Sequence, residues 1–372
     1  MPFPDIVPEL TDGVARLRAH AAGDIPRIVE QCTDPVSIRW TTVPVPYVEA
    51  SAREWVEAIG REWESEKGNR YWAITAADDP DGRFLGAIDV RPKGAGIATI
   101  GYGLHPEGRG RHLMTSALRL ATQWWFDQGG VRMVWEANRG NFASWRVAWA
   151  CGFTFEVALP QMLDDRGHAR DGWRGSIGLD GDLARPVAPW FDPPVLDGER
   201  VRLRPWADDD VAWVEPGDSP AHFMPPGSEP TRETFADWVL RRRERMSRSQ
   251  ALHWAIADAD SNRALGDLMI GFHQQEKGSG ELGYFLFPSA RGGGRAGAAT
   301  ALAVEHAFTP ARHGGLGLRR LLALTLADND PSSRLLERLG FREWGREPRF
   351  CAREDGTYDD ARHWVLLAPG TT

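Results

Sequence analysis

The chain of 372 residues is long enough for two domains of ordinary size, and its 42% hydrophobic and 26% charged residues are ordinary for a soluble globular protein. A net charge of −8 disfavours nucleic acid and anionic membranes as partners and suits a cationic acceptor such as an amine. Three distant cysteines, no Cys/His cluster, no leader-like N-terminus and no run of about 18 apolar residues predict a cytoplasmic protein without disulfide framework, metal site or membrane span.

The predicted elements follow the same order in both halves of the chain. Each half opens with a strand and two helices, followed by three strands, a Gly/Arg loop, a helix, a strand and a short helix, with one or two closing strands. In the first half we expect them at residues 14–18, 21–31, 52–66, 71–76, 84–90, 98–104, 113–128, 131–137 and 144–151. In the second half we expect them at residues 200–204, 207–216, 232–246, 253–257, 265–272, 281–286, 295–308, 319–326, 332–339 and 363–367. Segments 33–50 and 217–231 are expected to be irregular. This order implies a mixed sheet flanked by helices in each half, an α/β (α+β) fold.

Matching motifs indicate that the two halves are copies of one unit. The run Ile100–Pro106 returns as Leu282–Pro288, and an Arg-Gly pair follows at the same distance each time. The later pattern Asn-x-x-Ser-x-Arg, which leads to Gly-Phe, also occurs twice. We therefore predict domains at residues 1–184 and 197–372, joined by a proline-rich, semi-extended linker at 185–196.

The Gly/Arg loop of the second half has the composition of a phosphate-binding loop. It follows a predicted strand and opens a helix, and its sequence is Arg291, Gly292, Gly293, Gly294, Arg295 and Ala296. Glycine lets backbone N–H groups approach a ligand closely, and a helix N-terminus offers free donors and a positive dipole end. The loop lacks the Gly-Lys-Ser/Thr of a Walker loop and the glycine spacing of a dinucleotide fingerprint.

Residues 284–296 resemble the acetyl-CoA signature of the GNAT N-acetyltransferases, whose pattern is Gln/Arg-x-x-Gly-x-Gly/Ala. The motif Asn329-x-x-Ser332-x-Arg334 and the opening Val201–Pro205 are similar to the branch that acetylates ribosomal-protein N-termini. The resemblance covers nearly all of both halves and implies two tandem GNAT-type domains with mostly antiparallel central sheets. It implies that the amides of 292–296 hold the CoA pyrophosphate. The backbone of Leu286 would pair with the pantetheine arm, and Asn329 and Ser332 would contact the arm near the thiol.

The first half departs from this pattern. His112 stands where the pattern has Gly, and Met114 where it has Gly or Ala, so side chains are placed where phosphate would approach. This departure leaves a degenerate, scaffolding site as one alternative for the first half. The residues of the first half that correspond to the acetyl-CoA contacts are Leu104, Arg109, Gly110, Arg111, His112, Asn141 and Ser144.

Acetyl transfer to an amine requires a base, a donor to the oxyanion and an acid for the leaving thiolate. By the resemblance, Glu281 is the candidate base, with a surface or ion-paired carboxylate as the alternative; its first-half equivalent, Thr99, cannot take that role. Ser332 is the candidate to protonate the thiolate, with helix N-capping as its alternative role. No tyrosine occupies the helix at 332–339, so the general acid is unassigned. Tyr102 and Tyr284 are expected to pack.

The sequence therefore predicts an acetyl-CoA-dependent N-acetyltransferase that acts on a small-molecule amine or a peptide N-terminus, as a monomer or homodimer. Two alternatives remain: a tandem acetyltransferase resembling mycothiol synthase, and a non-catalytic acyl-CoA-binding protein.

Overall fold

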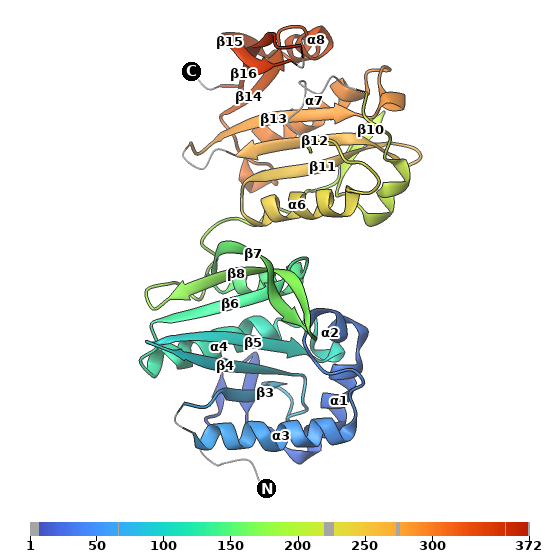
Figure 1. The fold of residues 1–372 in the computed structure, drawn as a ribbon. Coiled ribbons are helices and arrows are strands. Elements are labelled where there is room, and N and C mark those ends of the chain that lie inside the picture. Colours follow the sequence, from blue (N-terminus) through green and yellow to red (C-terminus); the bar gives the residue numbers. More distant parts are fainter. Residues whose placement is uncertain (1–6, 66, 219–226, 273–275, 354, 371–372) are drawn as a thin grey trace. The chain divides into compact units, whose positions relative to one another are not determined.

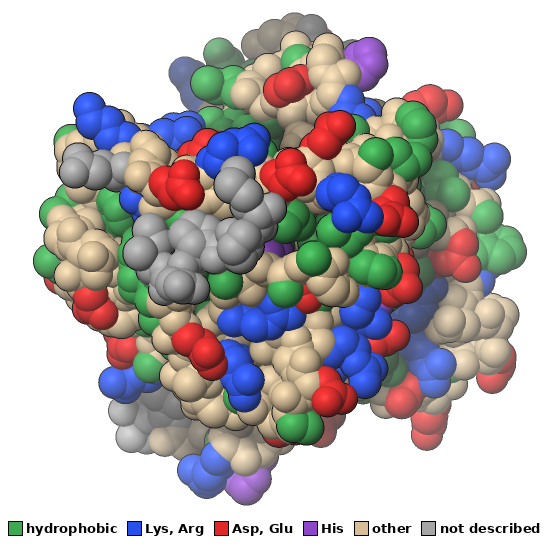
Figure 2. Space-filling model, turned by 90° about the horizontal axis from the view of Figure 1, so that it is seen from below, with side chains coloured by type: hydrophobic (Ala, Val, Ile, Leu, Met, Phe, Trp, Pro, Cys, Tyr) green, Lys and Arg blue, Asp and Glu red, His purple; other side chains and the backbone are tan. Residues whose placement is uncertain are grey.

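The computed structural model describes residues 7–65, 67–218, 227–272, 276–353 and 355–370. The chain forms two compact units, Met1–Val187 and Ala188–Thr372, and each is described by itself (Figure 1). Within the described residues, no helix is both long enough and apolar enough to cross a membrane. On the face shown in Figure 2, the described acidic and basic side chains are interspersed, without a large patch of one sign.

The first unit is built on an eight-stranded sheet with the strand order β1-β2-β3-β4-β5-β6-β8-β7. Among the described strands of this unit, only the pairing of β5 with β6 is parallel, because helix α4 lies between these two strands in the chain. The elements are β1 (Leu10–Thr11), β2 (Ala15–Arg18), α1 (Ile25–Thr33), α2 (Pro35–Trp40), α3 (Glu49–Glu64), β3 (Arg70–Ala76), β4 (Gly86–Gly94), β5 (Ile97–Leu104), α4 (Leu113–Asp127), β6 (Arg132–Asn138), α5 (Phe142–Ala150), β7 (Thr154–Asp165) and β8 (His168–Gly178).

The second unit repeats this plan with the strand order β15-β16-β14-β13-β12-β11-β10-β9. Within its described residues, one parallel pairing is present, which joins β13 to β14 on either side of α7 in the chain. The elements are β9 (Leu196–Asp197), β10 (Val201–Arg204), α6 (Phe235–Ser247), β11 (Ala251–Asp258), β12 (Ala264–Phe272), β13 (Ser279–Leu286), α7 (Arg295–Phe308), β14 (Arg320–Leu326), α8 (Asp330–Arg338), β15 (Arg342–Ala352) and β16 (Tyr358–Leu367).

Both faces of strand β11 in the second sheet are buried. Trp254 and Ile256 lie in one apolar cluster, which includes residues of α7, while Ala255 between them lies in another, with Trp238 of α6. Alternate side chains of a strand point to opposite faces, so helices on both sides are needed to exclude water from this strand. The two mixed sheets with flanking helices confirm the predicted fold class.

The structure corrects two expectations about local elements. Segment 33–50, expected to be irregular, contains helix α2, because the Asp34 carboxylate accepts a hydrogen bond from the Ser37 amide (3.0 Å) and Pro35 occupies the first helical position. The expected helix at 207–216 is a short 3₁₀ helix, Asp208–Trp213. Part of segment 217–231 lies outside the described residues.

Candidate functional site

The parallel strands at the centre of each sheet pair only over the first part of their length. In the first unit, Ile97–Ile100 of β5 pair with Arg132–Trp135 of β6, and the remaining residues of these two strands do not pair with each other. In the second unit, Ser279–Leu282 of β13 pair with Arg320–Ala323 of β14. Beyond these points the strands diverge, which leaves backbone N–H and C=O groups facing a gap inside the sheet. Such groups need a partner, because unsatisfied backbone groups are costly to bury.

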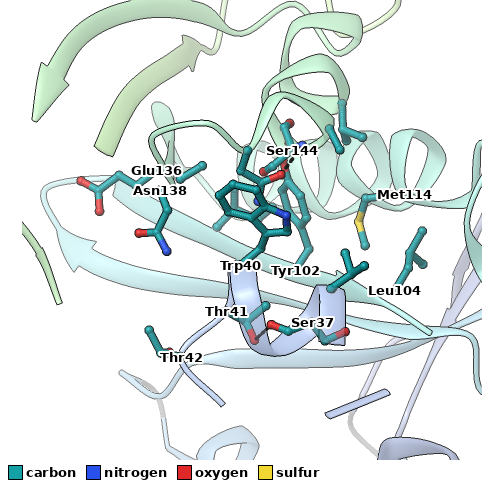
Figure 3. A pocket seen from close by; sticks show the side chains of 18 of the residues that line it. Ser37, Trp40, Thr41, Thr42, Tyr102, Leu104, Met114, Glu136, Asn138 and Ser144 are labelled. Atoms are coloured by element: carbon teal, nitrogen blue, oxygen red, sulfur yellow. Dashed lines mark hydrogen bonds between the residues drawn. The ribbon is translucent and has the colours of Figure 1, made fainter. Parts of the chain in front are cut away.

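In the first unit this gap opens into a cleft of about 470 Å³ (Figure 3). The far half of β5, the end of β6, the start of α5 and helix α2 all contribute to its lining. Four of the seven predicted contact residues of the first half line this cleft, and the loop residues Gly110, Arg111 and His112 do not. The four are Leu104, Arg109, Asn141 and Ser144. Met114, which departs from the family pattern, lines the cleft as well.

A tyrosine and a serine meet at the divergence point in both units. In the second unit the hydroxyl of Tyr284 lies 2.7 Å from Oγ of Ser332. In the first unit Ser144 Oγ donates to the Tyr102 hydroxyl (3.0 Å), and Trp135 Nε1 donates to Ser144 Oγ (3.0 Å). Burial raises the pKa of Tyr284, although the hydrogen bond with Ser332 opposes the shift, so this hydroxyl keeps its proton at neutral pH.

This pairing was missed by the sequence analysis. Tyr102 and Tyr284 were expected only to pack, yet both are hydrogen-bonded to the motif serine. The recurrence of Gly-Tyr at the same position of both copies was the available signal. The alternative role of Ser332 as an N-cap is wrong, because Asn329 caps α8 through its side-chain oxygen, which accepts from the Ser332 amide at 3.3 Å.

The glycine loop of the second unit presents free backbone donors. Gly292, Gly293 and Gly294 have φ of 83°, 60° and 74°, the left-handed region that favours glycine. Their amides donate to none of the described residues, and they precede the N-terminus of α7. A Cβ at Gly292 would meet no atom within 4 Å, so the loop is open toward solvent. Three free N–H groups at a helix N-terminus form a cradle suited to a phosphate or pyrophosphate.

The first-unit loop keeps the same backbone despite its different residues. His112 has φ 59° and ψ 7°, and Gly294 at the corresponding position has φ 74° and ψ 9°. The amides of residues 110–112 also donate to none of the described residues. The His112 side chain is exposed, whereas Met114 is buried and lines the cleft. The departure from the glycine pattern therefore changes the side chains at the site while leaving its backbone donors in place.

The two loop arginines are held by carboxylates. Arg291 Nη1 lies 2.6 Å from Asp218 in the second unit, and Arg109 pairs with Asp34 in the first. The hydrogen bond from Arg109 holds the pKa of Asp34 below its usual range. Each guanidinium also donates to the carbonyl of the last strand residue, Leu286 (3.3 Å) or Leu104 (3.4 Å). These contacts fix the arginines between the strand end and the loop.

Glu281 lies on β13, opposite Gly271 of β12 and Leu322 of β14. Its side chain is half-buried. Burial lowers the pKa of Arg245 on α6, and the charges of Asp267 and Glu281 oppose that shift, which places Glu281 within electrostatic reach of this helix. Its first-unit counterpart Thr99 lines the 470 Å³ cleft.

Comparison with known proteins assigns both units to one family. A model of the acetyltransferase (GNAT) domain matches residues 15–154 and again residues 200–342. The uncharacterized N-acetyltransferase YoaA of Bacillus subtilis (strain 168) is 25% identical over 181 residues, which are 47% of this chain and 98% of YoaA.

Solved structures of two acetyltransferases also match single units. The microcin C7 self-immunity acetyltransferase MccE, in complex with acetyl-CoA and AMP, is 20% identical with a TM-score of 0.41 and covers 45% of this chain and 93% of its own. The ribosomal α-N-protein acetyltransferase RimL, in complex with coenzyme A, is 19% identical with a TM-score of 0.42 and covers 47% of this chain and 99% of its own.

Proposed function

Since this chain belongs to the GNAT acetyltransferase family and is an acyltransferase that uses acetyl-CoA, we propose that its second unit transfers the acetyl group to a primary amine of a small molecule or of a peptide N-terminus. The observation that carries the proposal is the Tyr284–Ser332 pair, 2.7 Å apart, where β13 and β14 diverge beyond a loop of free amides. In this proposal the loop binds acetyl-CoA and the adjacent Tyr284–Ser332 pair transfers the proton.

The donor side of the proposed site is formed by backbone. The open amides of the glycine loop suit the pyrophosphate, with Arg291 and Arg295 adding positive charge and Ala296 leaving room at the start of α7. The unpaired far end of β13, including Leu286, suits an extended chain that carries amide groups. Acetyl-CoA supplies the acetyl group and a thiolate leaving group.

The chemistry requires one proton to leave the amine and one to reach the sulfur. We assign the first to Glu281, directly or through water, after which the neutral nitrogen attacks the carbonyl carbon. The C–N bond forms as the C–S bond breaks. The second proton comes from the Ser332 hydroxyl, which is hydrogen-bonded to Tyr284, and Asn329 holds Ser332 in place. In this scheme Tyr284 and Ser332 together fill the role of general acid, which the sequence left unassigned.

The acceptor is proposed to be cationic before reaction. The net charge of −8 favours the approach of an ammonium group. The MccE and RimL matches concern a microcin immunity protein and a ribosomal-protein acetyltransferase, so both small molecules and peptides belong in an acceptor panel.

The test is acetyl transfer from acetyl-CoA to a panel of aliphatic amines and peptides with free N-termini, with products identified by mass spectrometry. We expect Glu281→Gln to lower kcat about 100-fold and Ser332→Ala and Tyr284→Phe about 10-fold or more, within the range for lost acid or base catalysis. Calorimetric affinity for acetyl-CoA should change less than threefold in each.

The matched controls are Ser144→Ala and Tyr102→Phe in the first unit, which should leave the acetylation of second-unit acceptors unchanged. If Glu281→Gln and Ser332→Ala both kept the activity of the wild type, the proposed roles would be wrong. A wild-type chain that binds acetyl-CoA but acetylates no amine or peptide would contradict the proposed acceptor class.

A further inference from the structure

A short 3₁₀ helix, Pro106–Gly108, connects β5 to the Gly/Arg loop of the first unit. The residue before it, His105, is buried, and both of its ring nitrogens have hydrogen-bond partners. The backbone N–H of Glu107 donates to Nδ1 (3.2 Å), and Nη2 of Arg27 on α1 lies 3.1 Å from the same nitrogen. Nε2 lies 3.0 Å from a carboxylate oxygen of Glu30, also on α1. The imidazole therefore ties the start of the loop to helix α1.

These partners determine which ring nitrogen carries the proton. A guanidinium group and a backbone N–H can only donate, so Nδ1 must be an unprotonated acceptor. Nε2 then carries the ring proton and donates it to the Glu30 carboxylate. A second proton could be placed only on Nδ1, where it would break both hydrogen bonds and set the positive charges of His105 and Arg27 against each other, on nitrogens 3.1 Å apart. The contacts of this turn therefore require the neutral ring.

Charged groups surround this imidazole on each element that packs against it. They are Arg27 and Glu30 of α1, Glu107 of the turn itself and Arg83 of the connection between β3 and β4, which lies 3.7 Å from Glu107. Arg27 also donates to the Phe84 carbonyl (2.7 Å) and to Glu107 Oε2 (2.8 Å), and these bonds hold it beside the ring. The hydrogen bond from Arg27 lowers the pKa of Glu107, so this carboxylate keeps its charge in the range where imidazoles titrate.

The second unit holds the corresponding amide with a different group. Phe287 stands in place of His105, with φ −57° and ψ 149° against −56° and 145°, so the backbone is the same. The amide of Ser289, which corresponds to Glu107, donates to the carboxylate of Glu215 (2.9 Å). Burial opposes the shift, but hydrogen bonds from the Ser289 hydroxyl and amide lower the pKa of Glu215. One unit therefore holds this turn with an imidazole, and the other holds it with a carboxylate that stays charged at lower pH.

We propose that His105 positions the Gly/Arg loop of the first unit only while its imidazole is neutral, so that protonation releases the loop and weakens the binding of acetyl-CoA to this unit. The proposal rests on the proposed acetyltransferase function and adds to it donor binding by the first unit, through the free amides of residues 110–112. Because the bound loop requires the neutral ring, acidification weakens the binding of acetyl-CoA, and bound acetyl-CoA in turn opposes the protonation of His105.

The test measures the affinity of the full chain for acetyl-CoA by calorimetry at about pH 8 and about pH 5.5, on either side of the range in which imidazoles titrate. The Gly294→Glu chain isolates the first unit, and the Gly110→Glu chain isolates the second unit as the matched control. We expect the affinity of the Gly294→Glu chain to fall with pH at least about fivefold more than that of the control. The control also measures the effect of the donor's own phosphate monoester, whose second pKa is about 6.

Two substitutions of His105 separate its titration from its packing, both made in the Gly294→Glu chain. His105→Asn supplies an oxygen that can accept from the amide two residues later and does not titrate. It should restore the affinity at about pH 8 to within about twofold and remove the extra fall at about pH 5.5. His105→Phe copies the residue of the second unit and removes the acceptor, so it should weaken acetyl-CoA by a similar factor at both pH values. Thermal unfolding at both pH values shows whether each variant is folded, and either variant alone retains the test.

The same extra fall in affinity with and without His105 would overturn the proposal. So would a ¹⁵N spectrum of the histidines, assigned by comparison with His105→Asn, in which the ring of His105 carries its proton on Nδ1 at about pH 8. A Gly294→Glu chain that binds no acetyl-CoA at either pH would also overturn it, while leaving acetyl transfer by the second unit untouched. Conversely, pH-dependent binding in a chain that acetylates no amine or peptide would contradict the proposed acceptor class and support the role of His105.

Discussion

At the scale of single residues, His112 and Gly294 hold one backbone conformation with two very different side chains. A left-handed conformation costs a non-glycine residue about 1 kcal/mol, so the first unit keeps its loop shape against this cost. The conformation, and not the glycine itself, is therefore what the two loops share.

This equivalence predicts the effect of exchanging side chains at position 294. Gly294→His should cost about 1 kcal/mol of stability and change acetyl-CoA affinity less than threefold, because the histidine side chain at this conformation points to solvent in the first unit. Gly294→Glu should weaken acetyl-CoA at least tenfold, because it places a negative charge beside the pyrophosphate. Calorimetric titration measures the acetyl-CoA affinity of both variants. Equal losses of affinity would show that the bulk of the new side chain, rather than its charge, weakens binding.

A second residue-scale prediction concerns His20 of the first unit. The imidazole is buried against Trp55 and Phe84, with ring centroids 5.1 and 5.8 Å away. Burial lowers its pKa to about 4, outweighing the opposing charge of Asp24. In the unfolded chain His20 has its ordinary pKa of about 6.5, so it takes up a proton there before it does in the folded chain. The free energy of unfolding is therefore expected to fall by about 2 kcal/mol between pH 7 and pH 5.

The measurement is the free energy of unfolding by urea at pH 7 and pH 5. His20→Phe removes the titrating group, so the difference between wild type and variant isolates its contribution. The same pH dependence in both proteins would contradict the prediction.

The sequence could predict the Gly/Arg loop and the Asn-x-x-Ser motif because each is a short run of neighbouring residues whose structure depends mainly on those residues themselves. The Tyr284–Ser332 contact could not be found in this way, because it joins a strand to a helix that begins 46 residues later, at Asp330 (330 − 284).

At the scale of elements, helices α5 and α8 begin in the same way. The side-chain oxygen of Asn141 accepts from the Ser144 amide (3.1 Å), as that of Asn329 accepts from the Ser332 amide (3.3 Å). Each helix thus fixes the serine that meets the strand tyrosine, so helix stability and site geometry depend on one residue.

We predict that Asn329→Ala lowers the free energy of unfolding by about 1 kcal/mol, the usual cost of a lost N-cap, and lowers kcat because Ser332 loses its position. Asn329→Asp keeps a capping oxygen and should recover most of the stability. Urea unfolding and the acetyl-transfer assay measure the two effects. A kcat that falls without any loss of stability would show that Asn329 acts on substrate rather than on the helix.

The elements that the sequence predicted well are those with clear boundaries. Residues 295–308 form α7 as expected, and Gly340, with φ 87°, follows α8 as a C-terminal glycine does. The long hairpin of β7 and β8 was not located, because most β7 side chains are exposed and show no apolar alternation. Its turn residues Arg166 and Gly167 both have positive φ (53° and 82°). Asn-Gly is the usual sequence signal for such a turn, and Arg-Gly is a weaker one.

At the scale of the whole molecule, the two units repeat one plan of strands and helices, and we infer that they share one way of binding the acetyl donor. The free amides and the Tyr–Ser pair occur in both units, whereas the first unit has Thr99 where the second has Glu281.

The shared donor plan predicts that acetyl-CoA binds with a stoichiometry of two per chain. Gly294→Glu should leave one site and Gly110→Glu should leave the other, because each places a charge in one loop. Calorimetric titration gives the stoichiometry directly. A single site in the wild type, removed by Gly294→Glu, would make the first unit a scaffold in which Met114 fills the donor cleft.

We infer that an acetyl donor bound where the central strands diverge would become a temporary part of the sheet. An unpaired strand edge at the rim of a protein invites pairing with other chains, but here the open edges face each other inside the sheet. A donor bound in the gap would complete the hydrogen bonding of β5 or β13, so each bound donor should increase the free energy of unfolding. At a donor concentration of 100 times Kd this amounts to about 2.7 kcal/mol per site. Hydrogen exchange at residues 101–104 and 283–286 should slow accordingly, which makes these amides an internal gauge of occupancy during turnover.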